Sequence, residues 1–332
     1  MSFTTTILEW FKENGRTLPW RETSDPYAIW LSEIILQQTQ VKQGKAYWER
    51  FIVRWPTVEA LANATEDEVL REWQGLGYYS RARNLHTAAK QVVALGGFPT
   101  TIEGIKSLKG VGDYTAAAIG SIAFDLPVAV VDGNVYRVLA RHYGISTPIN
   151  TTEGKKLFAA LAQEQLLPAL DKEGKGAGLY NQAMMDFGAI QCTPTAPQCE
   201  QCPLVESCEA FREDRVGELP VKLKTLKVKQ RHLTYVYIRC QGHTAIHRRP
   251  AGDIWQGLYE PWLTEKVPSG AILQCQHVKH VLTHRILYAD FWMWETEERP
   301  PLPEGYFWIP EADIDNYAVP RLIEILLDRK KL

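Results

Sequence analysis

The chain has 332 residues, 45% of them hydrophobic, which is enough for two domains that each bury a core. No apolar run approaches the length of a membrane span, and the N-terminus lacks a basic region followed by an apolar one. We therefore expect no membrane contact, no secretion signal and a cytoplasmic location, associated with the nucleoid if the protein binds DNA. The formal net charge of −2 excludes an overall basic surface, so any contact with nucleic acid has to come from local clusters of basic residues.

A helix is predicted to begin at Asp25-Pro26, because proline is favoured at the first helical position, and to run through Thr39. Glu33 lies in the middle of this helix, and the residues one turn before and after it are largely apolar. Apolar surroundings raise the pKa of a carboxyl group, so Glu33 is a candidate proton donor at neutral pH. A surface acid or a salt-bridge partner is the alternative. Gln38 and Thr39, at the helix end, offer polar groups to base edges or phosphates.

Further helices are predicted over 47–55, 57–62 and 66–73. The segment 75–83 then combines glycines with two tyrosines and two arginines, among them Tyr78 and Arg81. Aromatic rings can wedge into a base stack while arginines bind phosphates. An ordinary helix start with core tyrosines is the alternative.

A two-glycine turn, Lys109-Gly110-Val111-Gly112, separates helical patterns at 101–108 and 114–124. We expect glycines here because a short turn between helices needs a positive φ or a close backbone approach. Backbone N–H groups of such a hairpin can bind a DNA phosphate. A common loop between helices is the alternative.

Asp132 precedes the next predicted helix, 135–143, about twenty residues after the hairpin. This spacing brings an acid close to a candidate phosphate-binding turn. The alternative is that Asp132 is simply the N-cap of its helix, because aspartate accepts hydrogen bonds from the first N–H groups.

Helices are also predicted over 152–170 and 180–190. Four cysteines follow within seventeen residues: Cys192, Cys199, Cys202 and Cys208. In a chain without a secretion signal this spacing indicates a metal site, and it suits a [4Fe–4S] cluster. Zinc is the rival, although zinc ribbons usually pair two CxxC knuckles and only one is present here.

Residues 213–231 are polar, rich in lysine and interrupted by Pro220, as in a linker. Beyond them, strands are predicted at 233–240, 244–247 and 288–295, and a short helix at 320–327. The C-terminal part is therefore predicted to be a separate α+β domain.

Several of these segments together resemble the MutY family of adenine DNA glycosylases in the helix-hairpin-helix superfamily. They are LPWR (18–21), SEIILQQTQV (32–41), GLGYYSRARNLH (75–86), LKGVGDYTAAA (108–118), VVDGNVYRVLAR (130–141) and the four cysteines. The resemblance implies an all-α glycosylase fold for residues 1–212, with a six-helix barrel over 27–134 and an iron–sulfur cluster module made of 1–26 and 135–212. It also implies a linker at 213–231 and an α+β Nudix-like domain over 232–332 that recognises 8-oxoguanine.

The resemblance also implies the reaction, which is base excision repair of adenine paired with 8-oxoguanine or guanine in double-stranded DNA. Glu33 matches the family's general acid, which protonates adenine and later acts as a base toward water. Asp132 matches the carboxylate that stabilises the oxocarbenium-like sugar or bonds to it. Tyr114 and Asn134 match residues that support this site.

The remaining residues that match the family are expected to bind DNA or the cofactors. The residues expected to bind the substrate are Trp20, Arg21, Leu36, Gln38, Thr39, Tyr78, Arg81 and Asp186. Trp20, Arg21 and Asp186 match the adenine pocket, whereas Gln38 and Tyr78 match side chains inserted into the duplex. Lys109 to Gly112 match the phosphate hairpin, where a monovalent or divalent cation is a second expected cofactor beside the [4Fe–4S] cluster of Cys192, Cys199, Cys202 and Cys208. The family's Phe-Ser-His loop aligns with Leu282, Thr283 and His284, so leucine replaces phenylalanine here.

Tyr114 stands where bifunctional glycosylases resembling endonuclease III carry a lysine that attacks the sugar. A phenol cannot form a Schiff base, so a monofunctional enzyme is expected, and we expect it to be a monomer. Two alternatives stay open: a bifunctional endonuclease III-like glycosylase/lyase and a non-catalytic iron–sulfur DNA-binding protein. Retention of both Glu33 and Asp132 argues against the second alternative. The C-terminal domain lacks the RExxEE set of Nudix hydrolases, so pyrophosphate hydrolysis is not expected.

Overall fold

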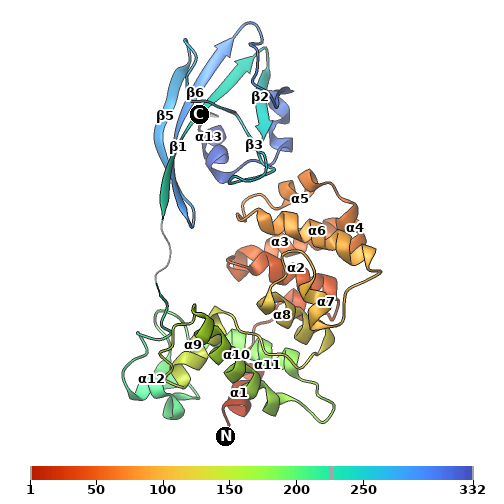
Figure 1. Ribbon diagram of the computed structural model, residues 1–332, viewed down its shortest axis with the longest axis vertical. Coiled ribbons are helices and arrows are strands. Elements are labelled where there is room, and N and C mark those ends of the chain that lie inside the picture. The colour runs from red at the N-terminus through yellow and green to blue at the C-terminus, as the bar shows by residue number, and fades with distance from the viewer. Residues whose placement is uncertain (1, 224–227, 331–332) are drawn as a thin grey trace. The chain divides into compact units, whose positions relative to one another are not determined.

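A computed structural model describes residues 2–223 and 228–330, so residues 224–227 of the predicted linker lie outside it. The chain divides into two compact units, which are described separately. Unit 1 comprises Met1–Ala62 and Thr87–Lys224, and unit 2 comprises Asn63–His86 and Thr225–Leu332. Helices fill the N-terminal two thirds of the chain, and the strands all come after them in the sequence (Figure 1). Among the described residues no helix combines the length and the apolar character that crossing a membrane requires.

Among its described residues, unit 1 has helices joined by loops and no strand. Its helices are α1 (Phe3–Asn14), α2 (Pro26–Leu36), α3 (Val41–Arg54), α7 (Ile102–Lys106), α8 (Asp113–Phe124), α9 (Gly133–His142), α10 (Thr152–Leu166), α11 (Ala177–Asp186) and α12 (Glu209–Arg212). The unit boundary falls within α4 (Val58–Asn63) and α6 (Ser80–Ala94).

Helix α2 is the most buried helix of unit 1 and packs against α3 and α8. It begins as predicted, because the Asp25 side chain accepts a hydrogen bond from the Tyr27 N–H (3.0 Å) and Pro26 occupies the first position. The prediction that it runs through Thr39 is wrong. The helix ends at Leu36, because Gln38 adopts a left-handed backbone with φ of 57° that an α-helix cannot contain.

Helices α1, α9, α10 and α11 of unit 1 pack around a hydrophobic core, in which Phe158, Tyr180 and Phe187 are fully buried. The prediction that α10 extends to residue 170 is wrong. The helix ends at Leu166, because Pro168 has no N–H to continue the hydrogen-bond ladder and a 3₁₀ turn follows. Leu219, from the predicted linker, is also buried in this core.

Unit 2 combines α5 (Glu66–Glu72) with a seven-stranded sheet in the order β3-β2-β1-β6-β5, in which β4 also pairs with β1 and β7 with β2. The strands are β1 (Lys229–Cys240), β2 (His243–Arg248), β3 (Tyr259–Glu260), β4 (Trp262–Leu263), β5 (Ile272–Val281), β6 (Arg285–Thr296) and β7 (Tyr306–Pro310). Strands β1 and β6 pair in parallel along their whole length. Because β1 begins at Lys229, it starts inside the segment predicted as a linker.

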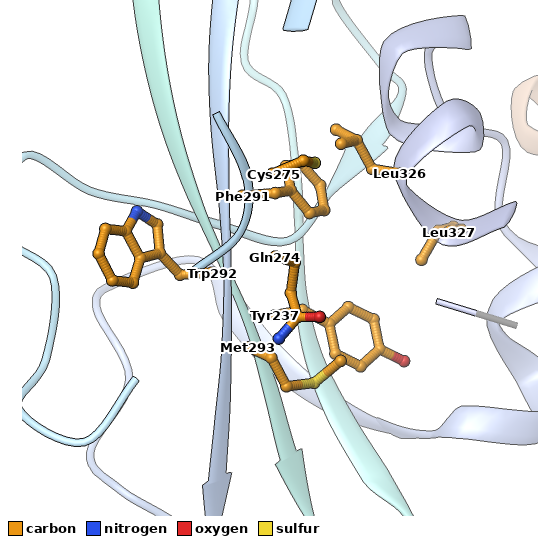
Figure 2. A pocket seen from close by; sticks show the side chains of 8 residues that line it. All are labelled: Tyr237, Gln274, Cys275, Phe291, Trp292, Met293, Leu326 and Leu327. Atoms are coloured by element: carbon orange, nitrogen blue, oxygen red, sulfur yellow. The ribbon is translucent and has the colours of Figure 1, made fainter. Parts of the chain in front are cut away.

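Helix α13 (Arg321–Lys330) packs on the sheet of unit 2, and Leu326 is buried in the core with Phe291 of β6. Figure 2 shows the small pocket of about 60 Å³ that remains between them, with Leu326 and Leu327 facing Phe291 and Tyr237. Its walls are mostly apolar and hold no pair of acidic or basic side chains. The pocket is therefore a packing gap of the core rather than a candidate for chemistry.

Candidate active site

Unit 1 contains a cavity of about 270 Å³ between α2, the start of α3, α8, the start of α9 and α11. Eight residues predicted for the site line it, although they come from distant parts of the chain. They are Trp20, Arg21, Glu33, Leu36, Thr39, Tyr114, Asp132 and Asn134. The fold thus brings the two predicted carboxyl groups into one cavity.

Glu33 is buried, with 8% of its surface exposed, so the alternative of a surface acid is wrong. Burial raises the pKa of its carboxyl to about 7, even though the hydrogen bond from Tyr114 lowers it. The Tyr114 hydroxyl donates to Oε2 at 2.7 Å, and burial keeps the pKa of this phenol well above its usual value. Glu33 can therefore hold a proton near neutral pH beside a neutral phenol.

Asp132 is the N-cap of α9, as the alternative interpretation predicted. Its Oδ1 accepts hydrogen bonds from the N–H groups of Asn134 (2.9 Å) and Val135 (2.8 Å), and Oδ2 accepts one from the Asn134 amide (2.8 Å). Burial raises the pKa of this carboxyl, and the three hydrogen bonds lower it. The same carboxylate lines the cavity, so capping a helix does not remove it from the site.

Arg137 holds the Asn134 side chain in place. Its Nη2 donates to Asn134 Oδ1 (2.8 Å) and to the Gly188 carbonyl (2.6 Å), and its Nε donates to the Cys192 carbonyl (2.7 Å). Gly188 approaches α9 so closely that a Cβ there would lie 2.6 Å from Asn134 Cβ, which only glycine permits. The start of α9 is thereby fixed to the segment that leads to the cysteines.

Asp186 lies behind the cavity wall, and the prediction that it forms part of the pocket itself is corrected accordingly. It is fully buried and accepts hydrogen bonds from Arg21 Nη1 and Nη2 (2.8 Å each) and from Arg16 Nε (2.9 Å). Burial alone would raise the pKa of this carboxyl, but the bonds from the two arginines hold it below its usual value. Asp186 therefore positions Arg16 and Arg21 on the wall.

Further polar side chains of the cavity were not predicted from the sequence, among them Arg16, Ser32 and Gln182. Gln182 precedes Asp186 by one turn of α11, so the helical spacing from Asp186 could have identified it. Ser32 adjoins Glu33 and donates to the Ile29 carbonyl at 2.7 Å. No local pattern distinguishes Arg16 from an ordinary surface arginine.

The glycine hairpin joins α7 to α8, and its two glycines differ. Gly110 has a positive φ of 80°, as predicted, whereas Gly112 has φ of −95° and is the N-cap of α8. A Cβ on Gly112 would meet no atom within 4 Å, so the prediction that its backbone or packing requires glycine is wrong. Val111 is buried, and the Lys109 N–H donates to Gln91 Oε1 (2.7 Å), so this N–H is engaged within the protein. No side chain caps the start of α8, and Gly112 and Asp113 are exposed there.

The four cysteines Cys192, Cys199, Cys202 and Cys208 are free thiols that line one hollow with largely apolar walls. Among the described residues, no three or more Cys, His, Asp or Glu side chains converge closely enough for a single metal ion. Arg141 lies beside the hollow, with Nη1 3.4 Å from Cys192 Sγ. Four thiols around one hollow beside a cation are a donor set that suits thiolate ligation of a metal centre.

Unit 2 has a pocket of about 590 Å³ between the segment 75–83 and residues 253–255 and 280–285. Leu282, Thr283 and His284 line it, as does Tyr78, whose hydroxyl is hydrogen-bonded to Thr283 Oγ1 at 2.7 Å. Arg81, predicted to bind the substrate, does not line this pocket. It is buried, burial lowers the pKa of its guanidinium to about 10, and its Nη2 donates to the Leu76 and Gly77 carbonyls.

Two family descriptions match the chain. Residues 31–164 match the HhH-GPD superfamily of base excision DNA repair proteins, and residues 234–329 match the NUDIX domain. The predicted fold classes, a helix-hairpin-helix glycosylase fold followed by an α+β Nudix-like domain, are thereby confirmed.

Curated relatives with the same name, adenine DNA glycosylase, come from bacteria and animals. One from Buchnera aphidicola subsp. Schizaphis graminum is 36% identical over 260 residues, covering 77% of this chain and 73% of the relative. The Homo sapiens relative is 43% identical over 220 residues, or 63% of this chain, but these are only 39% of its own length.

Two solved structures each match 64% of this chain. A thermostable thymine-DNA glycosylase is 33% identical with a TM-score of 0.58, covering 64% of this chain and 95% of its own. An endonuclease III–DNA complex, at 20% identity and a TM-score of 0.52, shares the fold. With a relative that is 36% identical and matched over most of both chains, the chain belongs to the adenine DNA glycosylase family of base excision repair enzymes.

Proposed function

We propose that the protein is a monofunctional glycosylase that hydrolyses the N-glycosidic bond of adenine paired with 8-oxoguanine, or with guanine, in double-stranded DNA. The observation that carries this proposal is the pair of carboxyls in one cavity. Glu33 has a pKa near 7, and Asp132 is bound by three hydrogen-bond donors. A volume of about 270 Å³ is close to the lower limit of small-molecule sites, about 300 Å³, and suits a single base turned out of the duplex.

The reaction begins with a proton, because adenine leaves poorly as an anion. Glu33 donates its proton to adenine N7 and the bond between the sugar and the base breaks. The ionised Asp132 then stabilises the positive charge on the sugar, or bonds to it, as in retaining glycosidases. Glu33, now ionised, accepts a proton from the attacking water. The products are adenine and an abasic site.

The other residues of the cavity orient the base and the carboxyls. Tyr114 holds Glu33, and Asn134 holds Asp132, through the hydrogen bonds described above. Arg21, positioned by Asp186, offers donors to ring nitrogens of the adenine. Trp20, Leu36 and Thr39 complete the walls that exclude water from the base, and Gln182 adds an amide that matches the donors and acceptors of adenine.

Contacts with the duplex come from exposed segments. Gln38 is exposed at the turn after α2, and we assign it a role as a wedge that offsets part of the unstacking cost of a few kcal/mol. The hairpin Lys109 to Gly112 holds a phosphate, with a monovalent or divalent cation as its second ligand. In unit 2, Tyr78, Leu282, Thr283 and His284 recognise the 8-oxoguanine.

We assign a [4Fe–4S] cluster to Cys192, Cys199, Cys202 and Cys208. The four thiolates would hold the cluster, and this ligation would fix the segment between residues 192 and 208. Arg141 offsets the negative charge of the thiolates. The division into a catalytic part (1–212), a linker (213–231) and a recognition domain (232–332), like the monomeric state, stays a prediction.

The proposal is tested with a duplex that contains one A·8-oxoG pair. Because Tyr114 cannot form a Schiff base, we expect strand breaks mainly after alkali and no covalent complex after borohydride reduction. Breaks of equal yield without alkali would revive the bifunctional alternative. Binding without release of adenine would support the non-catalytic alternative.

Removing the hydroxyl of Thr283 should weaken the preference for A·8-oxoG over A·G. The hydrogen bond between Thr283 and Tyr78 is worth about 1 kcal/mol, so we expect the ratio of the two single-turnover rates to fall about three- to tenfold in Thr283→Ala. Tyr78→Phe should have a similar effect, and the double variant should be no worse than either. Thr264→Ala, which removes another hydrogen-bonded hydroxyl of unit 2 outside this pocket, is the control. An unchanged ratio in Thr283→Ala would contradict the assignment.

A further inference from the structure

Gly44 is an unusual residue for its place in the fold. It is buried in the first half of α3, its N–H donates to the Gln40 carbonyl (2.9 Å), and its φ is not in the left-handed region. Glycine lowers the stability of a helix relative to alanine, and no backbone conformation requires it here. The presence of glycine at this position must therefore be explained by the atoms around the place where a Cβ would lie.

The neighbour of that missing atom is Leu36. A Cβ on Gly44 would lie 2.7 Å from Leu36 Cδ2, closer than real carbon atoms approach, and 3.4 Å from Ile35 Cγ2. Ile35 is fully buried and cannot yield, whereas Leu36 Cδ2 is the end of a flexible side chain. An added methyl group would thus be accommodated by a shift of Leu36.

The cavity of Glu33 and Asp132 lies on one side of Leu36. Leu36 is the last residue of α2 and lines the cavity that holds Glu33 and Asp132. One side of its side chain packs on α3 and the other faces this cavity, so a Leu36 pushed away from α3 moves into the space proposed for the base. Because only the end of a flexible side chain has to move, we expect the fold to be kept and the cavity to become narrower.

We infer that Gly44 is a positioning residue that sets the width of the base cavity by letting Leu36 lie against α3. The inference rests on the proposed function, because it gives Gly44 a role in accommodating the turned-out adenine. Gly44 itself touches no substrate and acts only through Leu36.

The test compares the parent with Gly44→Ala, Leu36→Ala and the double variant. In single turnovers on an A·8-oxoG duplex, Gly44→Ala should release adenine about 10- to 100-fold more slowly, the range expected for a misplacement of about 1 Å. Its Kd for an undamaged duplex should be unchanged, and its Tm should be equal or higher because alanine favours helix. Once Leu36 is alanine, adding Gly44→Ala should change the rate less than twofold, because no Cδ atom remains to be displaced.

Gln43→Ala is the matched control, since it changes an exposed position next to Gly44 on α3 and should leave the rate unchanged. A crystal structure of Gly44→Ala should show Leu36 displaced into the cavity. If the parent is active and Gly44→Ala is equally fast, or if the loss persists without Leu36, the inference is overturned while the proposed function stands. If the parent releases no adenine, both the inference about Gly44 and the proposed function are wrong.

Discussion

Replacing Glu33 by glutamine is expected to slow the single-turnover release of adenine by about 10³-fold. Glutamine keeps the size of the side chain and can accept the hydrogen bond from Tyr114, but it has no proton to donate, and general acid catalysis contributes about 10²- to 10⁴-fold. Glu49→Gln, the same change at an exposed glutamate of α3, is the control and should leave the rate unchanged. A Glu33→Gln rate within tenfold of the parent's would exclude Glu33 as the acid.

The pH dependence of the parent enzyme follows from the same residue. Burial raises the pKa of Glu33 to about 7, so the acid is protonated below that pH and loses its proton above it. The rate of adenine release should therefore be highest below pH 7 and fall about tenfold for each further pH unit above it. Glu33→Gln should lack this decline. A parent rate that increases as the pH rises through 7 would contradict the assignment.

Replacing Asp132 by asparagine is expected to slow adenine release by about 10²- to 10³-fold with little loss of stability. Asparagine is as good an N-cap as aspartate, so α9 keeps its start, but the negative charge that stabilises the developing sugar cation is gone. Single-turnover rates and thermal unfolding of the same variant separate the two roles of this side chain. We expect a Tm within a few degrees of the parent's.

Asp25→Asn provides the matched control for Asp132→Asn, because Asp25 caps α2 in the same way but does not line the cavity. This variant should keep its rate. If Asp132→Asn is fully active, Asp132 serves only as the N-cap of α9, and the proposed role of its charge in catalysis is wrong. If Asp132→Asn is inactive because it does not fold, Asp132→Glu is the second test, since it keeps the negative charge. Asp132→Glu should recover part of the rate if catalysis needs that charge.

Features set by neighbouring residues could be predicted from the sequence. The start of α2 follows from Asp25-Pro26, and the burial of Glu33 follows from the apolar residues one turn away. The end of α2 could not be predicted, because Gln37 to Gln40 can continue a helix as well as form a turn. The left-handed backbone at Gln38 depends on α3 turning back against α2.

Residues whose surroundings are distant in sequence were harder to place. Arg81 and Asp186 look like accessible polar residues, yet both are buried with partners that only the fold supplies. Gly44 has no local signature either, since its reason is a leucine at the end of the preceding helix. Strand β5 was not predicted because two apolar residues (Ile272, Leu273) and two polar residues (Gln276, His277) stand next to each other in it, so it lacks the alternation of a half-buried strand.

The anchoring of Arg16 and Arg21 by Asp186 has a consequence for the time at which the enzyme becomes active. The arginines and their partner are 170 and 165 positions apart, and a ribosome adds about 5–20 residues per second. A growing chain therefore carries Glu33, Tyr114 and Asp132 for several seconds before the wall beside Glu33 can close. A chain that has not yet reached residue 186 therefore lacks the contact that positions both arginines on the cavity wall, so the base cavity is complete only after that residue has been added.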